Sequence, residues 1–136
     1  MKTLVLYYSY TGHTEQIAQV LAAKESCDIA EIKDIYRPGK LKAYALGCFA
    51  AMRGKAWPIQ SLDTNLAAYN RIVLLSPVWA GNPPPAVHAV LQQFPLGKTI
   101  SVKMISAGSE SKCKELIKNI IEMKKGTLES FEDIKA

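Results

Sequence analysis

The stretch Ser9-Tyr10-Thr11-Gly12-His13-Thr14 decides the fold of this chain. It follows the apolar run Thr3–Tyr8, which is typical of a strand buried on both faces. After it, Ile17, Val20 and Leu21 recur at helical spacing and predict the buried face of a helix. The stretch is therefore predicted to be a tight turn that leads from a buried strand into the N-terminus of a helix.

Such a turn is suited to binding an anion. A helix N-terminus offers backbone N–H groups without intrahelical partners, together with the positive end of the helix dipole. Three hydroxyls, on Ser9, Thr11 and Thr14, stand around these donors, and Gly12 allows the backbone a close approach. The same hydroxyls also fit a second interpretation, because Ser and Thr commonly cap helices. The turn lacks the three glycines of a dinucleotide fingerprint and the Gly-Lys-Ser/Thr ending of a P-loop.

Length and composition predict one globular domain over residues 1–136. The hydrophobic fraction is 49% and the charged fraction 21%, as in ordinary globular proteins. No apolar run reaches the roughly 18 residues that a bilayer span needs, so no membrane association and a cytoplasmic location are expected. The three cysteines lack metal-ligand spacing, and no metal site is predicted.

The net charge of +5 comes from one stretch of the sequence. Residues 36–62 contain Arg37, Lys40, Lys42, Arg53 and Lys55 but no Asp or Glu, so the rest of the chain is neutral. No nucleic-acid-reading motif accompanies these charges, which favours a solvated face or an anionic small-molecule or protein partner over nucleic acid. The amphipathic segment 41–52 inside the stretch is a candidate surface for a partner or a homodimer.

Strand and helix patterns alternate along the whole chain. Right-handed crossovers between them predict an α/β, doubly wound, five-stranded parallel sheet with helices on both faces. The order 2-1-3-4-5 places the two charged strands at the edges and the apolar strands inside. His88, off the buried stripe of its helix, is expected at the surface. The predicted strands are 3–8, 28–35, 71–76, 99–106 and 127–134, and the predicted helices are 13–24, 41–52, 85–94 and 113–121.

In this order the turns after strands one, three and four meet where such sheets bind ligands. The second turn, Pro77-Val78-Trp79-Ala80-Gly81-Asn82, is stiffened by prolines, and it presents Trp79 either for stacking on a flat ligand or for core packing. The third turn, Ser106-Ala107-Gly108-Ser109, is small enough for the edge of a ring to approach its backbone. A planar heterocycle with a terminal phosphate fits all three turns.

Both the Ser-x-Thr-Gly-x-Thr turn and the Pro-Val-Trp-Ala-Gly-Asn-Pro loop resemble those of the flavodoxin family, and the resemblance extends over the whole chain. It implies flavin mononucleotide (FMN) as the cofactor, with the phosphate at the first turn and the ring at the other two. It also implies that a backbone peptide beside the flavin can turn over on reduction, and Gly81, or the Ala80–Gly81 peptide, is the position for this. The implied cofactor-binding residues are Ser9, Tyr10, Thr11, Gly12, His13, Thr14, Pro77, Val78, Trp79, Ala80, Gly81, Asn82, Ser106, Ala107, Gly108 and Ser109.

The resemblance leaves two functions open. One is a redox protein that transfers electrons through bound flavin to a partner protein or a small acceptor. The other is an FMN-dependent NAD(P)H reductase of quinones or similar acceptors, favoured by a basic composition and by the lack of an aromatic residue in 106–109, which leaves one flavin face open. No catalytic acid or base is predicted in either case, since the flavin carries the chemistry. A flavin-free adaptor is a third possibility, whereas Ser9-Tyr10 and Ser76-Pro77 exclude the acidic site of a phospho-receiver.

Overall fold

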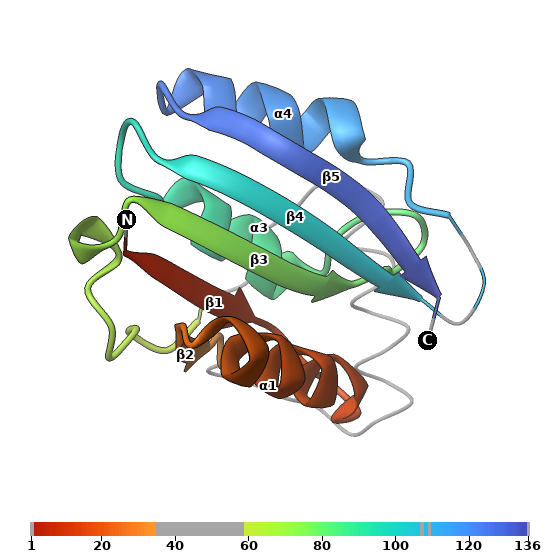
Figure 1. Ribbon diagram of the computed structural model, residues 1–136. Helices are drawn as coiled ribbons and strands as arrows, with labels where there is room; N and C mark the ends of the chain where they lie inside the picture. The colour runs from red at the N-terminus through yellow and green to blue at the C-terminus, as the bar shows by residue number, and fades with distance from the viewer. Residues whose placement is uncertain (1, 35–58, 107, 109, 136) are drawn as a thin grey trace.

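The computed structural model describes residues 2–34, 59–106, 108 and 110–135. The predicted helix 41–52 and the basic residues of 37–55 lie outside this part of the chain, as do Ala107 and Ser109. The elements are β1 (Thr3–Tyr7), α1 (His13–Glu25), β2 (Asp28–Glu31), a 3-10 helix η1 (Leu66–Ala68), β3 (Arg71–Pro77), α3 (Pro85–Gln92), β4 (Thr99–Ser106), α4 (Lys114–Met123) and β5 (Thr127–Lys135) (Figure 1).

The five strands form one parallel sheet in the order β2-β1-β3-β4-β5. The predicted fold class and strand order are therefore confirmed. Strands β1 and β3 pair in register from Thr3 with Arg71 to Tyr7 with Leu75. Because parallel strands point the same way, the carboxyl ends of β1, β3 and β4 lie along one edge of the sheet (Figure 1).

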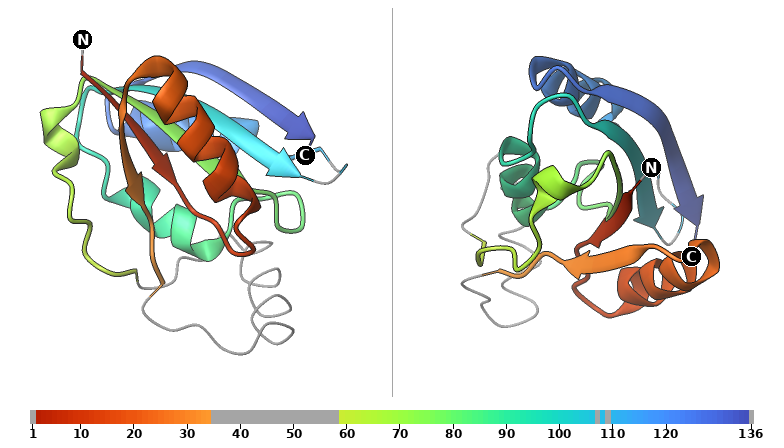
Figure 2. Two further views of the ribbon diagram at one scale, coloured as in Figure 1. Left: turned by 60° about the horizontal axis from the view of Figure 1, so that its bottom comes forward. Right: turned by 60° about the vertical axis from the view of Figure 1, so that its left-hand side comes forward.

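Alternate residues of the central strands supply two separate cores. On one face, side chains such as Leu4, Leu74 and Val102 pack against α3 and α4. On the other face, Val5, Val73 and the neighbouring strand residues pack against α1. Figure 2 shows α1 on the side of the sheet opposite α3 and α4. The continuous apolar runs of β1 and β3 thus reflect burial on both faces, as expected for central parallel strands.

The face of α1 that enters the core includes two of the three predicted residues, since Ile17 and Leu21 are partly buried and pack against it. Its buried residues are Thr14, Ala18 and Ala22. Val20 is 68% exposed, so its predicted core position is wrong. Small residues at the centre of this face let the helix approach the sheet closely, with Ile17 and Leu21 packed beside them. Within the described residues, no helix is long and apolar enough to cross a bilayer.

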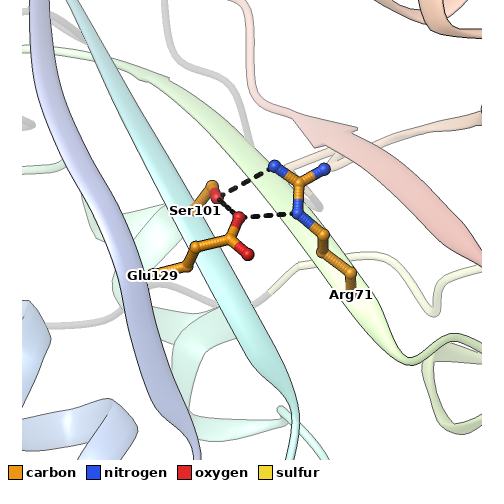
Figure 3. Close-up of polar contacts among 3 residues, drawn as sticks. All are labelled: Arg71, Ser101 and Glu129. Carbon is orange, nitrogen blue, oxygen red and sulfur yellow. Dashed lines mark hydrogen bonds and ion pairs between the residues drawn. The ribbon is translucent and has the colours of Figure 1, made fainter. Parts of the chain in front are cut away.

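The sheet face that packs against α1 also carries a row of hydrogen-bonded polar side chains across β3, β4 and β5 (Figure 3). Arg71, Ser101 and Glu129 form this polar ladder. The Arg71 Nε lies 2.7 Å from the Glu129 Oε1, and Arg71 also donates to the Ser101 hydroxyl over 3.3 Å. The Ser101 hydroxyl donates to the same Glu129 oxygen over 2.8 Å. These hydrogen bonds, first that from Arg71 and then that from Ser101, lower the pKa of Glu129. The ladder satisfies polar groups on a part of the sheet that no described helix covers.

Replacing Glu129 by Gln should lower the free energy of unfolding by about 0.5–1 kcal/mol at pH 7 and low salt, because the pair with Arg71 is partly exposed. The folded pKa of Glu129 is depressed, so this contribution is present above the unfolded pKa and disappears as the pH falls through the folded value. Urea denaturation at pH 7 and pH 3 measures both effects. Glu122→Gln, at an exposed position of α4, is the control; equal effects of the two variants would contradict the ladder's contribution.

Candidate functional site

The first turn leads from β1 into α1 without a side-chain cap. Gly12 is the N-cap residue, with φ at 95°, and no side chain accepts from the first turn of the helix. The Ser9 hydroxyl instead accepts from the Gly12 N–H over 3.0 Å, which closes the turn on itself. The capping interpretation of the hydroxyls is therefore wrong. By helix geometry, the N–H groups of His13 and Thr14 have no intrahelical acceptor and remain available to an anion.

The second turn is a two-residue hairpin built on Ala80 and Gly81. The Trp79 N–H donates to the Asn82 carbonyl over 2.8 Å, and the Asn82 N–H donates back to the Trp79 carbonyl over 3.0 Å. Both central residues have positive φ, 52° for Ala80 and 81° for Gly81, as in a type I′ turn. Only glycine adopts this conformation without cost, so Ala80 holds local strain.

Backbone hydrogen bonds attach this hairpin to the segments around the third turn. The Val78 N–H donates to the carbonyl of Ile105, near the end of β4, over 3.2 Å. The Lys112 N–H, after the third turn, donates to the Gly81 carbonyl over 2.6 Å. Ser106 at the end of β4 is partly buried and Gly108 is exposed. The structure thus places the second turn directly beside the entrance and exit of the third.

An aromatic contact joins the first turn to the second. The ring centroids of Tyr10 and Trp79 are 5.7 Å apart with the planes at 90°, an edge-to-face arrangement. Tyr8 meets the same indole at 6.1 Å and 73°. Trp79 is only 4% exposed and belongs to the core. Of the two roles left open for Trp79, its burial favours core packing, because stacking on a ligand requires the indole to be uncovered first.

Two residues that shape this region, Tyr8 and Asp34, were not predicted from the sequence. The hydroxyl of Tyr8, 2% exposed at the end of the first strand, donates to the Asp34 carboxylate over 2.6 Å. This contact joins residues 26 positions apart, and no local pattern encodes it. A tyrosine that ends an apolar strand and an aspartate after the next strand were the available signals. The pair fixes the ring that lies against Trp79.

Two titratable groups near these turns, Tyr7 and Cys113, stay neutral at pH 7. Tyr7, at the end of β1, has its pKa raised to about 12, mainly by burial and further by Glu31 and Glu15. Its hydroxyl donates to Glu15 over 3.3 Å. Burial also raises the pKa of the Cys113 thiol to about 11. At neutral pH, neither of these two groups offers an anion as a nucleophile or base.

The expectation of a surface position for His88 is wrong. His88 is 3% exposed, and its Nε2 is buried without a hydrogen-bond partner among the described residues. Six of the eight residues of α3 are buried, so the helix has almost no face left for water. Burial lowers the pKa of the imidazole, since the charged form would lose its hydration.

Comparison with known proteins supports the fold. No family model and no curated protein sequence matches the chain. A flavoprotein from Lactobacillus acidophilus, solved in complex with FMN, has a TM-score of 0.78 over 97% of this chain and 92% of that one, at 22% identity. The Megasphaera elsdenii flavodoxin, in its two-electron reduced form, has a TM-score of 0.59 over 96% of this chain and 84% of that one, at 15% identity.

An NADPH-quinone reductase from P. pentosaceus gives a TM-score of 0.65 over 99% of this chain and 85% of that one, at 10% identity. At such identities the similarity establishes the fold, and the chain has the flavodoxin-like fold that its turns and strand order predict. These structural neighbours are a flavoprotein with FMN, a flavodoxin and a quinone reductase.

Ala80→Gly should stabilise the protein by about 0.5–1 kcal/mol, because relief of the left-handed strain exceeds the entropy that glycine adds to the unfolded chain. Ala23→Gly, at an exposed position of α1, should instead destabilise by about 1 kcal/mol. Chemical denaturation measures the change in the free energy of unfolding for each variant, which should be positive for Ala80→Gly and negative for Ala23→Gly. A loss of stability in Ala80→Gly as large as that in Ala23→Gly would contradict the strain at Ala80.

The free energy of unfolding should fall between pH 7 and pH 5, with a contribution from His88 of at most about 1.4 kcal/mol per pH unit. The folded pKa of His88 lies below the unfolded value of about 6.5, so the unfolded chain takes up the proton first and is favoured as the pH drops. His88→Phe should flatten this dependence, because it removes the buried imidazole. Identical pH profiles in native protein and His88→Phe would contradict the assignment.

Proposed function

We propose that the chain is an FMN-binding redox protein, with its cofactor at the carboxyl edge of the sheet. The contact between Tyr10 and Trp79, at 5.7 Å between ring centroids, carries the proposal. It brings a turn suited to phosphate next to the hairpin that would border the ring, at the point in the strand order 2-1-3-4-5 where open α/β sheets bind ligands. The FMN complex and the flavodoxin among the neighbours support this assignment.

In this proposal the first turn, Ser9–Thr14, holds the phosphate. The uncapped N–H groups at the start of α1 donate to its oxygens, the helix dipole favours its charge, and the exposed Thr11 hydroxyl adds a donor. The positive φ of Gly12 sets the path of the backbone here. Because the turn has no Lys or Arg, binding rests on short hydrogen bonds and not on long-range charge attraction.

The second and third turns border the ring in the same proposal. Pro77–Asn82 offers backbone groups from a hairpin that is hydrogen-bonded to Ile105 and Lys112, and the third turn, Ser106, Ala107, Gly108 and Ser109, supplies small residues. The Ala80–Gly81 peptide is the centre of the type I′ turn. Turning it over gives a type II′ turn, which favours glycine at the position that Ala80 occupies. Ala80 therefore opposes the peptide rotation that the family resemblance implies.

When bound, FMN supplies one- and two-electron transfer. The residues of this chain bind and orient the group, and the first two turns contain no carboxylate. A redox partner protein or a small acceptor receives the electrons, in a cytoplasmic location. The second candidate is an NAD(P)H-dependent quinone reductase, supported by the lack of an aromatic residue in 106–109 and by the reductase among the neighbours. Steady oxidation of NAD(P)H by a quinone in the presence of the protein would indicate the reductase, and its absence would favour the electron-transfer protein.

FMN should bind saturably to the purified protein, with shifted flavin absorbance, and riboflavin should bind at least about tenfold more weakly because it lacks the phosphate. Thr11→Glu places a negative charge in the first turn and should weaken FMN by about tenfold while sparing riboflavin. Thr127→Glu, an exposed residue at the opposite end of the sheet, is the control and should change neither affinity. Failure of FMN to bind at all would overturn the proposal. Equal affinities for FMN and riboflavin would show that the first turn does not bind the phosphate.

A further inference from the structure

A carboxylate of β5 holds the chain where it leaves the third turn. The Asp133 Oδ1 accepts a hydrogen bond from the Ser111 N–H over 3.1 Å, although the two residues are 22 positions apart. The next N–H along the chain, that of Lys112, donates to the Gly81 carbonyl over 2.6 Å. Two consecutive backbone N–H groups thus form a bridge, Ser111–Lys112, between β5 and the hairpin of the second turn.

The alternation of side chains along β5 explains why Asp133 reaches this bridge. Successive residues of a strand point to opposite faces of the sheet. Phe131 packs against the core beneath α3 and α4, so Asp133 points to the same side. Glu132 lies between them and pairs instead with Lys103 over 2.6 Å. Because α4 packs along β5 (Figure 1), Asp133 lies near the start of this helix.

The bridge is also fixed by the residues around it. Cys113, which follows the bridge, is fully buried in the core. The Lys112 side chain passes over Gly81, where a Cβ on residue 81 would lie 3.5 Å from the Lys112 Cγ. At the other end of the third turn, Ser106 pairs with Lys135 of β5. Only residues 107–110 therefore separate two points at which this turn is attached to the sheet.

A turn attached at both ends loses less conformational freedom when it binds a ligand, and this raises the affinity without any new contact. The bond from Ser111 to Asp133 fixes the exit of the third turn, and the bond from Lys112 to Gly81 sets its position against the hairpin. The first turn is not part of this arrangement. An effect on the ring should therefore be the same for FMN and for riboflavin.

From these contacts we propose that Asp133 is a positioning residue for the flavin ring, acting through the Ser111–Lys112 bridge on the second and third turns. The inference rests on the proposed function, because it takes the ring as the ligand of these turns. Asp133 itself touches neither the ring nor the phosphate. A role confined to the stability of α4 would instead lower the melting temperature and leave the affinity for flavins unchanged.

Three variants of the full chain separate the hydrogen bond from the charge. Asp133→Ala removes both, Asp133→Asn keeps the Oδ1 acceptor, and Glu132→Ala removes the neighbouring exposed carboxylate on the other face. Titration followed by flavin fluorescence should show that Asp133→Ala binds both FMN and riboflavin about fivefold more weakly than the native protein. Asp133→Asn and Glu132→Ala should remain within about twofold of the native affinities.

A second measurement needs no cofactor. Amide hydrogen exchange of the flavin-free protein should be about fivefold faster at Ser111 and Lys112 in Asp133→Ala, because the bridge opens more often. Exchange at the same two amides should not change in Glu132→Ala. Circular dichroism verifies the fold of each variant, and both substituted residues are exposed, so the fold should be retained.

Four outcomes would overturn the inference. Unchanged exchange at Ser111 and Lys112 would show that Asp133 does not hold the bridge. Equal weakening in Asp133→Asn and Asp133→Ala would assign the effect to charge and not to the hydrogen bond. A lower melting temperature of Asp133→Ala with unchanged flavin affinities would leave it a structural role alone. Failure of the native protein to bind FMN or riboflavin would overturn the proposed function and this inference with it, whatever the exchange shows.

Discussion

The in-register parallel pairing of β1 with β3 is the constraint on which the rest of the structure depends. It extends from Thr3 opposite Arg71 to Tyr7 opposite Leu75, so the two strands end side by side. The chain after each strand must then turn at the same edge of the sheet. The Tyr8 N–H continues the pairing by donating to the Leu75 carbonyl over 3.1 Å. A slip of one residue would reverse the side-chain faces and exchange the two cores.

The two faces of the sheet are covered to different extents by the described helices. Toward α3 and α4, apolar side chains form a core that also includes Trp79 and the buried Cys113. Toward α1, close packing of Ala18 and Ala22 covers only part of the sheet, and hydrogen-bonded charges occupy the rest. The result is one face closed by helices and one that combines α1 with a polar ladder.

Sequence reasoning succeeded where local pattern and topology agree. Apolar runs of the right length, separated by helical periodicities, were sufficient for the strand order, and Thr99–Ser106 has the bounds that its pattern indicated. It failed where a residue's surroundings come from distant parts of the chain. Val20 fits a helical stripe, yet the sheet accepts the smaller Ala18 and Ala22. His88 lies off its stripe, yet α3 is buried almost all round.

The sequence by itself determined the parallel fold, the position of the three turns and the chemistry available in them. Glycine, proline and hydroxyl residues act through local backbone geometry, which neighbouring residues largely dictate. Only the tertiary structure decided that Trp79 is buried, that Tyr10 meets it and that Tyr8 bonds to Asp34. These outcomes depend on side chains brought together across the sheet, because contact between residues distant in sequence is set by strand order and register.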